Sequence, residues 1–293
     1  MLKISVVTPS FNQVGFLDAT IRSVLDQGYE NLEYVVIDGG SDDGSLSILH
    51  RYGSRLHYWV SEKDGGIADA LNKGFCKTSG DIMGWIGSDD LYHPWTFSTV
   101  NEIFSMFPEV DWIMGVPVHW DRTGRISRFI SEHPRGKFDY LTGYYQWLQQ
   151  ESIFWRRSLW ERTGARIDET IALAIDTELW TRFFDAAELY HVECPLGGWR
   201  PWGGNRSITH AGRMHAEIRA CLERMEARQD ARTLQQLKRL RFYLAVPQSR
   251  FGVAWRHILW TLRPDAELAR VAGYKAIVQD GKGWSIEERP RQL

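Results

Sequence analysis

The chain has 293 residues, of which 43% are hydrophobic and 25% charged, with a formal net charge of −2. This composition is typical of a soluble globular protein, and the small net charge argues against nucleic acid as a partner. The three cysteines lie far apart, so the sequence predicts neither a zinc site nor a disulfide framework.

We expect neither a signal peptide nor a membrane-spanning segment in this sequence. The N-terminal residues enter a β-branched apolar stretch at once and do not read as a signal peptide. No apolar run approaches the roughly 18 residues of a membrane span. We therefore expect a cytoplasmic protein, and leave open a peripheral contact with the inner face of the plasma membrane.

Apolar strands alternate with amphipathic helices over the first third of the chain. Strands are expected at 4–8, 34–37, 57–60 and 82–86, with apolar residues at helical spacing between them. This alternation predicts an α/β fold with a parallel, doubly wound sheet. The carboxyl ends of its strands should line one crevice, where ligands bind in such folds.

The pattern changes after Pro94. A hairpin is predicted from strands at 118–120 and 126–129, and the chain looks helical from about Ser207 nearly to its end. We expect a domain over 1–207, with a nucleotide-binding half (1–100) and an acceptor-binding half (101–207), and a helical C-terminal extension over 208–293. The other elements expected are helices at 95–107, 157–164 and 174–183 and strands at 112–116 and 152–155.

Two adjacent carboxylates, Asp89 and Asp90, follow the fourth strand. Like charges at the end of a buried strand repel each other unless a cation or hydrogen-bond donors lie between them. A hard divalent ion, Mg²⁺ or Mn²⁺, shared with the phosphates of a substrate, is the predicted occupant. The alternative is that one of these acids caps the helix after Pro94.

Acidic residues also end the second and third strands, at Asp38 and Asp64. Taken singly, each fits a turn. Together with Asp89 and Asp90 they surround the expected crevice. Carboxylates gathered there are costly unless hydrogen-bond donors or a cation offset their charge. A nucleotide provides one, because its base and ribose donate hydrogen bonds and its diphosphate binds a metal.

Two further segments allow either a contact with the ligand or a purely structural role. The loop at Thr8, Pro9 and Asn12 exposes backbone groups that suit a flat base. Asp69 and Lys73 are four residues apart on a helix and are expected to form a surface pair, whereas Asn72 between them suits a close approach of another backbone.

Asp176 is a candidate general base. It lies at the start of an amphipathic helix after two apolar residues, and partial desolvation would raise its proton affinity. The alternative is an N-cap. The glycine-rich loop that follows, over 199–207, carries Arg200 and Arg206, whose planar guanidinium groups suit phosphate oxygens.

Four motifs in order closely resemble those of the family-2 glycosyltransferases of the GT-A fold, and the resemblance continues more weakly to about Ser207. They are the segments 4–12, 36–45, 62–74 and 85–92. The resemblance implies a Rossmann-like, mostly parallel sheet flanked by helices. It also implies an enzyme that inverts the anomeric centre of the sugar it transfers.

The resemblance assigns roles to particular residues. Asp38 and Asp64 bind the base, Asp89 and Asp90 hold ribose and metal, and Asp176 is the catalytic base. The acceptor-binding residues are expected to be Gln150, Glu151 and Trp180. The full nucleotide-sugar-binding set is expected to be Thr8, Pro9, Asn12, Asp38, Ser41, Asp64, Asn72, Ser88, Asp89, Arg200 and Arg206.

Three positions depart from the family pattern. Gly87 stands where many members carry an acid, Ile175 replaces a common Glu, and Trp202 stands where a His is common. These departures keep a non-catalytic relative that binds nucleotide-sugar or glycan as an alternative. A sugar nucleotidyltransferase is the other, although the loop after the first strand lacks the Gly-rich, basic character that such an enzyme needs.

The expected reaction is metal-dependent transfer of a sugar to a hydroxyl of a glycan or a lipid-linked acceptor. The donor would be a UDP, GDP or dTDP sugar. The stretch 206–263 holds 12 Lys or Arg against 4 Asp or Glu. Its apolar face, formed by Phe251, Trp255, Ile258, Leu259 and Leu262, is expected either to pack on the catalytic domain or in a homodimer, or to lie on anionic lipid.

Overall fold

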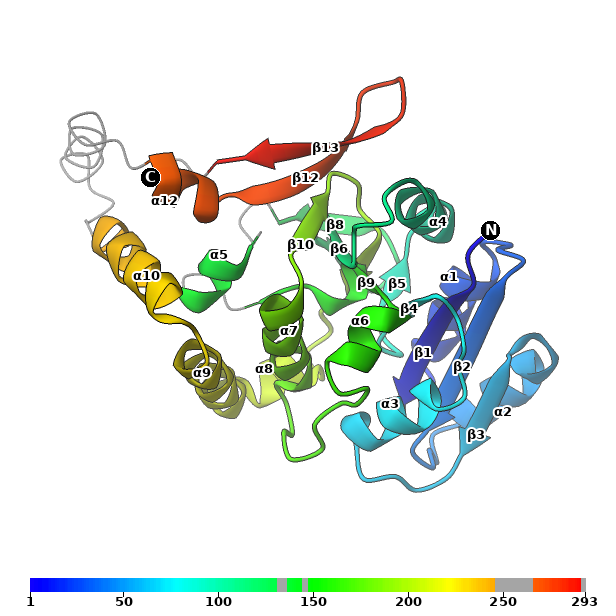
Figure 1. Cartoon of the computed structure of the whole chain (residues 1–293). Helices are drawn as coiled ribbons and strands as arrows, with labels where there is room; N and C mark the ends of the chain where they lie inside the picture. Colours follow the sequence, from blue (N-terminus) through cyan, green and yellow to red (C-terminus); the bar gives the residue numbers. More distant parts are fainter. Residues whose placement is uncertain (131–135, 144–146, 246–265, 291–293) are drawn as a thin grey trace.

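A nine-stranded sheet forms the centre of the molecule (Figure 1). The structure is a computed structural model that describes residues 1–130, 136–143, 147–245 and 266–290. The strand order is β13-β12-β10-β6-β9-β4-β1-β2-β3. The first four strands pair in parallel, and β9 runs antiparallel to both of its neighbours. The predicted α/β fold with a mostly parallel sheet is confirmed.

The strands of this sheet come from every part of the chain. They are β1 (Ile4–Ser10), β2 (Leu32–Asp38), β3 (Tyr58–Ser61), β4 (Ile82–Trp85), β6 (Trp112–Gly115), β9 (Ile153–Arg156), β10 (Leu189–Val192), β12 (Tyr274–Gln279) and β13 (Trp284–Arg289).

Helices cover both faces of the sheet because successive strand residues point to opposite sides. Val7 of β1 packs in the cluster with α3, α6 and α7, whereas its neighbour Val6 packs in the cluster with α1, α2 and α4. The helices are α1 (Leu17–Leu25), α2 (Ser45–Tyr52), α3 (Ile67–Phe75), α4 (Thr96–Met106), α5 (Lys137–Leu141), α6 (Arg157–Arg162), α7 (Ile175–Ala186), α8 (Arg206–Thr209), α9 (Ala211–Ala227), α10 (Ala231–Leu244) and α12 (Ala266–Val271).

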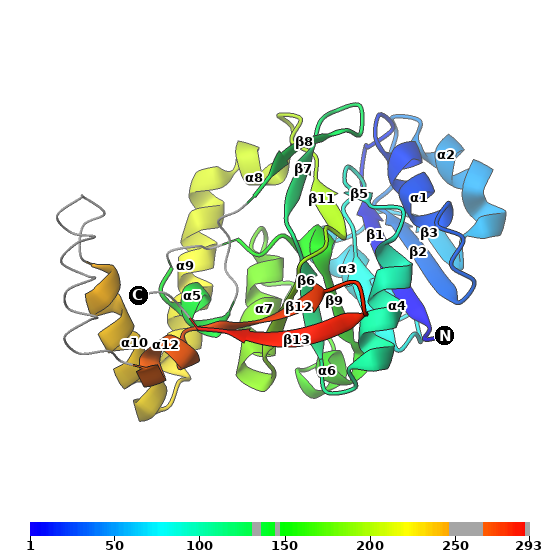
Figure 2. The same cartoon turned by 90° about the horizontal axis from the view of Figure 1, so that it is seen from above.

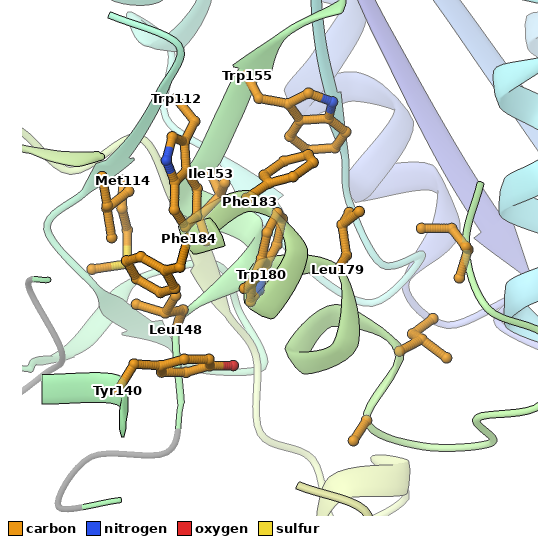
Figure 3. Close-up of a cluster of buried hydrophobic side chains, with 14 of the residues drawn as sticks. Trp112, Met114, Tyr140, Leu148, Ile153, Trp155, Leu179, Trp180, Phe183 and Phe184 are labelled. Carbon is orange, nitrogen blue, oxygen red and sulfur yellow. The ribbon is translucent and has the colours of Figure 1, made fainter. Parts of the chain in front are cut away.

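Indole rings fill the core on the α7 side of the sheet. Trp180 of α7 stacks on Trp85, with ring centroids 5.4 Å apart, and on Trp112, at 5.7 Å. Figure 3 shows Trp180 among Trp112, Trp155 and Phe183. This packing holds α7 against the last residue of β4 and the first residue of β6.

A second sheet of four short strands, ordered β5-β11-β7-β8, extends beside the first. The predicted hairpin is confirmed as β7 (Val118–Trp120) and β8 (Ile126–Phe129), which pair antiparallel around the turn that begins at Asp121. β5 (Leu91–Tyr92) and β11 (Gly197–Trp199) complete it. Because β5 directly follows Asp89 and Asp90, the two sheets meet at these acids.

The C-terminal extension departs from expectation at its end. The stretches α8 to α10 and α12 are helical as predicted, but residues 274–289 form the hairpin β12–β13 instead of a helix. β12 pairs in parallel with β10, so the hairpin widens the main sheet (Figure 1). The periodicity of the preceding helices does not continue past Gly273, and the β-branched and aromatic residues there pair with an already formed edge.

Helices α9 and α10 contribute Ile218 and Leu240 to the same core as α7. The boundary proposed at residue 207 stays a prediction. The apolar face from Phe251 to Leu262 lies outside the described residues, and so do the two interpretations offered for it. Within the described ranges, no helix has the length and apolarity that crossing a membrane requires.

Candidate functional site

One large cavity, of about 1810 Å³, opens at the carboxyl ends of β1, β2, β3 and β4. It extends to the second sheet, where His119 of β7 and Arg128 of β8 line it. Ten residues predicted from the sequence lie in its wall. They are Pro9, Asn12, Asp64, Ser88, Asp89, Asp90, Gln150, Glu151, Asp176 and Arg206.

Six predicted residues do not line the cavity: Thr8, Asp38, Ser41, Asn72, Trp180 and Arg200. Asp38 is fully buried, and its carboxylate accepts hydrogen bonds from Oγ of Ser41, at 2.6 Å, and Oγ of Ser61, at 2.7 Å. It therefore ties the ends of β2 and β3 together behind the cavity wall. Thr8 pairs with the hydroxyl of Tyr34, 3.1 Å away.

Asp64 occupies the cavity wall at the end of β3. One oxygen accepts a bond from the backbone N–H of Gly66, at 2.8 Å, and the other lies beside Gly39, where a Cβ would stand only 3.0 Å away. A side chain at Gly39 would push this carboxylate out of place. The glycine after β2 thus leaves room for an acid supplied by the next strand.

Asn72 serves a structural purpose. Its amide nitrogen donates to the carbonyl of Ile167, at 3.0 Å, and its amide oxygen accepts from the N–H of the same residue, at 2.8 Å. This two-way bond holds the loop before α7 against α3. Lys73 pairs with Asp69, 3.2 Å away, which confirms the surface pair.

The carboxylate of Asp89 is held by two donors from the loop after β11. Oδ2 accepts hydrogen bonds from Nε1 of Trp202, at 2.8 Å, and Nδ2 of Asn205, at 3.0 Å. The Trp202 ring also packs on Phe16, with centroids 5.1 Å apart. Both donors bind Oδ2, whereas Oδ1 lies beside Gly87, which also lines the cavity.

Asp90 is buried and lies against a second acid, Glu151. One oxygen of Asp90 accepts the backbone N–H of Arg200, at 2.8 Å. Burial, with the charges of Glu151 and Asp89, raises the pKa of Asp90 well above its usual range. Burial also raises the pKa of Glu151 to about 7, and a hydrogen bond joins the two side chains. Burial and the mutual repulsion of these carboxylates therefore both favour the protonated form over two adjacent charges.

Gly87 leaves open space beside the carboxylates of Asp89 and Asp90. A Cβ at this position would lie 2.7 Å from Oδ2 of Asp90 and 3.0 Å from Oδ1 of Asp89. Two oxygens from different carboxylates thus converge over a residue without a side chain. The arrangement fits a hard divalent cation that takes its other ligands from water and a diphosphate. Among the described residues, no cluster of three or more metal-ligating side chains is present.

The alternative in which Asp89 or Asp90 caps the helix after Pro94 is wrong. That helix, α4, begins at Thr96, and its N-cap residue is Trp95, without a side-chain hydrogen bond. Arg200 is buried behind these acids, where its Nε donates to the backbone carbonyl of Asp89 and its guanidinium covers the Phe16 ring. Arg206, in contrast, is exposed in the cavity wall.

Asp176 lies in the first turn of α7 and faces the cavity. The residue before the helix is Ala174, so Asp176 is not its N-cap. Oδ1 accepts a bond from the N–H of Thr177, at 2.7 Å. Burial outweighs this bond and raises the pKa of Asp176 to about 6. Its carboxylate is therefore ionised at neutral pH and is more basic than an ordinary aspartate.

The predicted acceptor residues separate into two groups. Gln150 and Glu151 form the short 3₁₀ turn before β9 and line the cavity, and the amide of Gln150 donates to the carbonyl of Trp85, at 3.1 Å. Trp180 is completely buried in the core. It supports Trp85, the last residue of β4, and makes no contact with the cavity.

Two further cavity residues, Ser10 and Asn205, were not predicted from the sequence. Ser10 carries a buried hydroxyl without a hydrogen-bond partner in the described structure, and Asn205 orients Asp89. Ser10 stands inside the first recognised motif, so its place could have been inferred. The hydrogen bond from Asn205 to Asp89 could not have been inferred, because the two residues are 116 positions apart in the sequence.

Comparison with known proteins decides the family. The family model described as glycosyl transferase family 2 matches residues 5–178, more than half of the chain. The chain belongs to this family. It is 31% identical over 195 residues to the uncharacterized glycosyltransferase Rv1514c of Mycobacterium tuberculosis, which covers 66% of this chain and 73% of that protein.

Two solved structures share the fold. TarS 1-349 of S. aureus in complex with UDP-GlcNAc has a TM-score of 0.66 at 14% identity, over 91% of this chain and 77% of that one. The mannosyltransferase PcManGT of Pyrobaculum calidifontis, in complex with GDP-Man and Mn²⁺, has a TM-score of 0.59 at 19% identity, over 92% and 78%. This chain is therefore a glycosyltransferase of the GT-A fold.

Proposed function

We propose that this glycosyltransferase moves a sugar from a nucleoside-diphosphate sugar to a hydroxyl of a glycan or lipid-linked acceptor, with inversion at the anomeric carbon. The observation that carries the proposal is the convergence of four carboxylates on one cavity. Asp89 and Asp90 follow β4, Glu151 precedes β9 and Asp176 lies in α7, and all four line its wall.

The donor would occupy the end of the cavity near β1, β2 and β3. Asp64 and the unpartnered hydroxyl of Ser10 offer acceptors to the edge of a base, and Asn12 is held beside them by Oγ of Ser41, 2.8 Å from its N–H. Asp38 acts by fixing Ser41. The solved relatives with UDP-GlcNAc and GDP-Man support a UDP or GDP sugar, and dTDP remains an alternative.

The diphosphate would then lie over Asp89 and Asp90. A divalent ion, Mn²⁺ or Mg²⁺, would be held by Oδ1 of Asp89 and Oδ2 of Asp90, and when bound it supplies positive charge for the departing diphosphate. Arg206 adds a cation in the same wall. Arg200 contributes by donating from Nε to the backbone carbonyl of Asp89 and from its backbone N–H to the carboxylate of Asp90.

Asp176 acts as the general base. Its carboxylate takes the proton of the acceptor hydroxyl while that oxygen forms a bond to the anomeric carbon. The bond from the anomeric carbon to the diphosphate oxygen breaks on the opposite side, and the nucleoside diphosphate leaves with the electron pair. A pKa of about 6 suits this task, because the base is free at pH 7 yet holds the proton well.

The test is the variant Asp176→Asn, with Glu288→Gln as an acid-removing control on β13, away from the cavity. Asp176→Asn should lose transfer by at least about a thousandfold. Its melting temperature should still rise when UDP or GDP is added with Mn²⁺. Full turnover by Asp176→Asn would show that another group is the base. Failure of every nucleotide to stabilise the wild type would overturn the proposed donor.

A further inference from the structure

The second sheet forms one wall of the cavity, and the reaction described above does not use that wall. Strand pairing places Arg128 of β8 opposite His119 of β7, and His119 beside Trp199 of β11. Side chains directly across from one another share a face of the sheet, and all three line the cavity. Figure 2 shows β7 and β8 at the edge of the molecule opposite β12 and β13. One row of side chains therefore crosses this wall, from its outer strand to β11.

The row contains one arginine whose charge has no partner. Arg128 is exposed, and no ion pair or hydrogen bond joins its guanidinium to a described residue. Its neighbours on the hairpin, Arg122 and Arg125, do not line the cavity. The other lysine and arginine of the described cavity wall, Lys63 after β3 and Arg206 in α8, belong to other elements. The second sheet therefore presents a single positive charge to the cavity.

Aromatic rings continue the row inward from this charge. The His119 ring packs edge-on against Trp199, with centroids 5.0 Å apart. Burial, with the charge of Arg128, lowers the pKa of His119, so the imidazole is neutral and Arg128 carries the charge at this point of the wall. An aromatic surface with one polar group at its end suits the ring of a sugar that carries a charged substituent.

Strand β11 connects the row to the reaction centre. A Cβ at Gly197, two residues before Trp199, would overlap the backbone carbonyl of Glu151. Burial and the charge of Asp176 raise the pKa of Glu151, so these two carboxylates lie near each other. Arg128 stands two strand spacings, roughly 10 Å, from β11. That span is longer than one sugar ring, so a group bound to Arg128 belongs to a sugar next to the one that reaches Asp176.

We propose that Arg128 recognises a carboxylate on the acceptor, and that the acceptor is an oligosaccharide with an acidic sugar next to the unit that receives the transferred sugar. The guanidinium would pair with the carboxylate, and the ring of the acidic sugar would lie against His119 and Trp199. One guanidinium fork matches one carboxylate, and the row holds no second positive charge for a phosphate. This inference rests on the proposed function and names its acceptor class.

The test is calorimetric binding of acidic oligosaccharides to the full chain. The probes are a galacturonate trimer, a mannuronate trimer and a hyaluronan tetrasaccharide, each compared with its carboxyl methyl ester. The ester removes the charge and keeps the sugar rings. The wild type should bind at least one acid about three- to fivefold more tightly than its ester, as expected for an exposed ion pair. R128Q should bind that acid as weakly as the ester.

The matched control is R125Q, which removes the same charge from the same hairpin outside the cavity wall. It should keep the preference for the acid. R128K keeps the charge without the planar fork and should keep only part of the preference. W199L should weaken binding of acid and ester alike, because it removes the ring surface and leaves the charge. Salt at about 0.5 M should remove the preference of the wild type.

Three results would overturn the proposal. One is a wild type that binds no acid of the panel more tightly than its ester. Another is an equal loss of preference in R128Q and R125Q, which would indicate general attraction to a positive surface. The third is Arg128-dependent binding of maltose phosphate that is tighter than that of every acid, which would assign the site to a phosphate.

The donor is tested separately from the acceptor. Oligosaccharide binding is measured with and without UDP and Mn²⁺. Thermal stabilisation by UDP or GDP with Mn²⁺ should be the same in R128Q and the wild type. Its absence in the wild type would count against the proposed donor and would leave the comparison of acid with ester as it stands.

Discussion

The indole nitrogen of Trp202 lies 2.8 Å from Oδ2 of Asp89. This bond joins the loop after β11 to the end of β4. Trp202 donates one hydrogen bond and also packs on Phe16. It therefore acts on the proposed metal site through the carboxylate that it orients.

Removing this donor should loosen the site without breaking the fold. Trp202→Phe keeps an aromatic ring against Phe16 and loses the N–H. Asp89 retains only the bond from Asn205, so we expect the concentration of Mn²⁺ needed for half-maximal activity to rise about three- to tenfold. A thermal-shift titration with Mn²⁺ and UDP or GDP should show the same change without relying on turnover.

Trp95→Phe is the matched control. Trp95 also donates from its indole nitrogen, to the carbonyl of Pro195 at 2.9 Å, but it lies outside the cavity. It should leave the Mn²⁺ requirement unchanged. If both variants shift it equally, or if neither does, Trp202 does not position Asp89.

The raised pKa of Asp176 predicts the acid limb of the pH profile. The carboxylate must be ionised to take a proton, and burial raises its pKa to about 6. Below that pH, kcat/KM should fall about tenfold per pH unit. A profile that stays flat down to about pH 4.5, measured with a saturating divalent ion, would mean that Asp176 is not the base.

The raised pKa of Asp176 also predicts that its ionised carboxylate destabilises the folded chain. Asp176 has a higher pKa in the folded chain than the 3.8 of an ordinary aspartate, so the native state binds the extra proton between these values. Stability is therefore lost as pH rises through about 4 to 6. Asp176→Asn should gain on the order of 1–3 kcal/mol at pH 8 and little at pH 4.

Denaturant unfolding at the two pH values measures this difference. Glu288→Gln serves again as the control, since it should show no such dependence. A gain at pH 8 that is no larger than the gain at pH 4 would indicate that burial of Asp176 is not what shifts its titration.

Replacing each of two helical glycines by alanine should change the free energy of unfolding in opposite directions. A Cβ at Gly74 of α3 would lie 2.3 Å from Cγ1 of Val7, whereas a Cβ at Gly212 of α9 meets nothing within 4 Å. Gly74→Ala should destabilise by about 1–3 kcal/mol, because α3 must move away from β1. Gly212→Ala should stabilise by about 0.5–1 kcal/mol. Chemical denaturation of both variants gives the comparison, and equal signs would contradict the close approach of α3 to the sheet.

Much of the first half of the fold could be predicted because its strands alternate with helices and each ends in polar residues. Asp64, Asp89 and Asp90 therefore reach the cavity as expected. Asp38 shows the limit of this argument. It ends its strand as predicted, but its carboxylate turns inward to Ser41 and Ser61, a choice that the strand pattern does not encode.

Other positions depend on contacts between distant segments. Trp180 was expected at the acceptor, yet it packs against Trp85 and Trp112 in the core, since its helix face is decided by the whole aromatic cluster. Asp90 and Glu151 interact only because the turn before β9 meets the end of β4. The final hairpin likewise becomes a pair of strands because β10 offers it an edge.

That edge has a consequence for synthesis of the chain. Lys275 of β12 lies beside Tyr190 of β10 and follows it by 85 residues. A ribosome that adds 5–20 residues per second would leave β10 without this neighbour for roughly 4–17 s. During that time the newly made strand, with Tyr190 and Val192 on it, is open to other nascent chains. Slow translation or crowded polysomes should therefore favour aggregation at this edge, and a chaperone that covers it should raise the yield of folded protein.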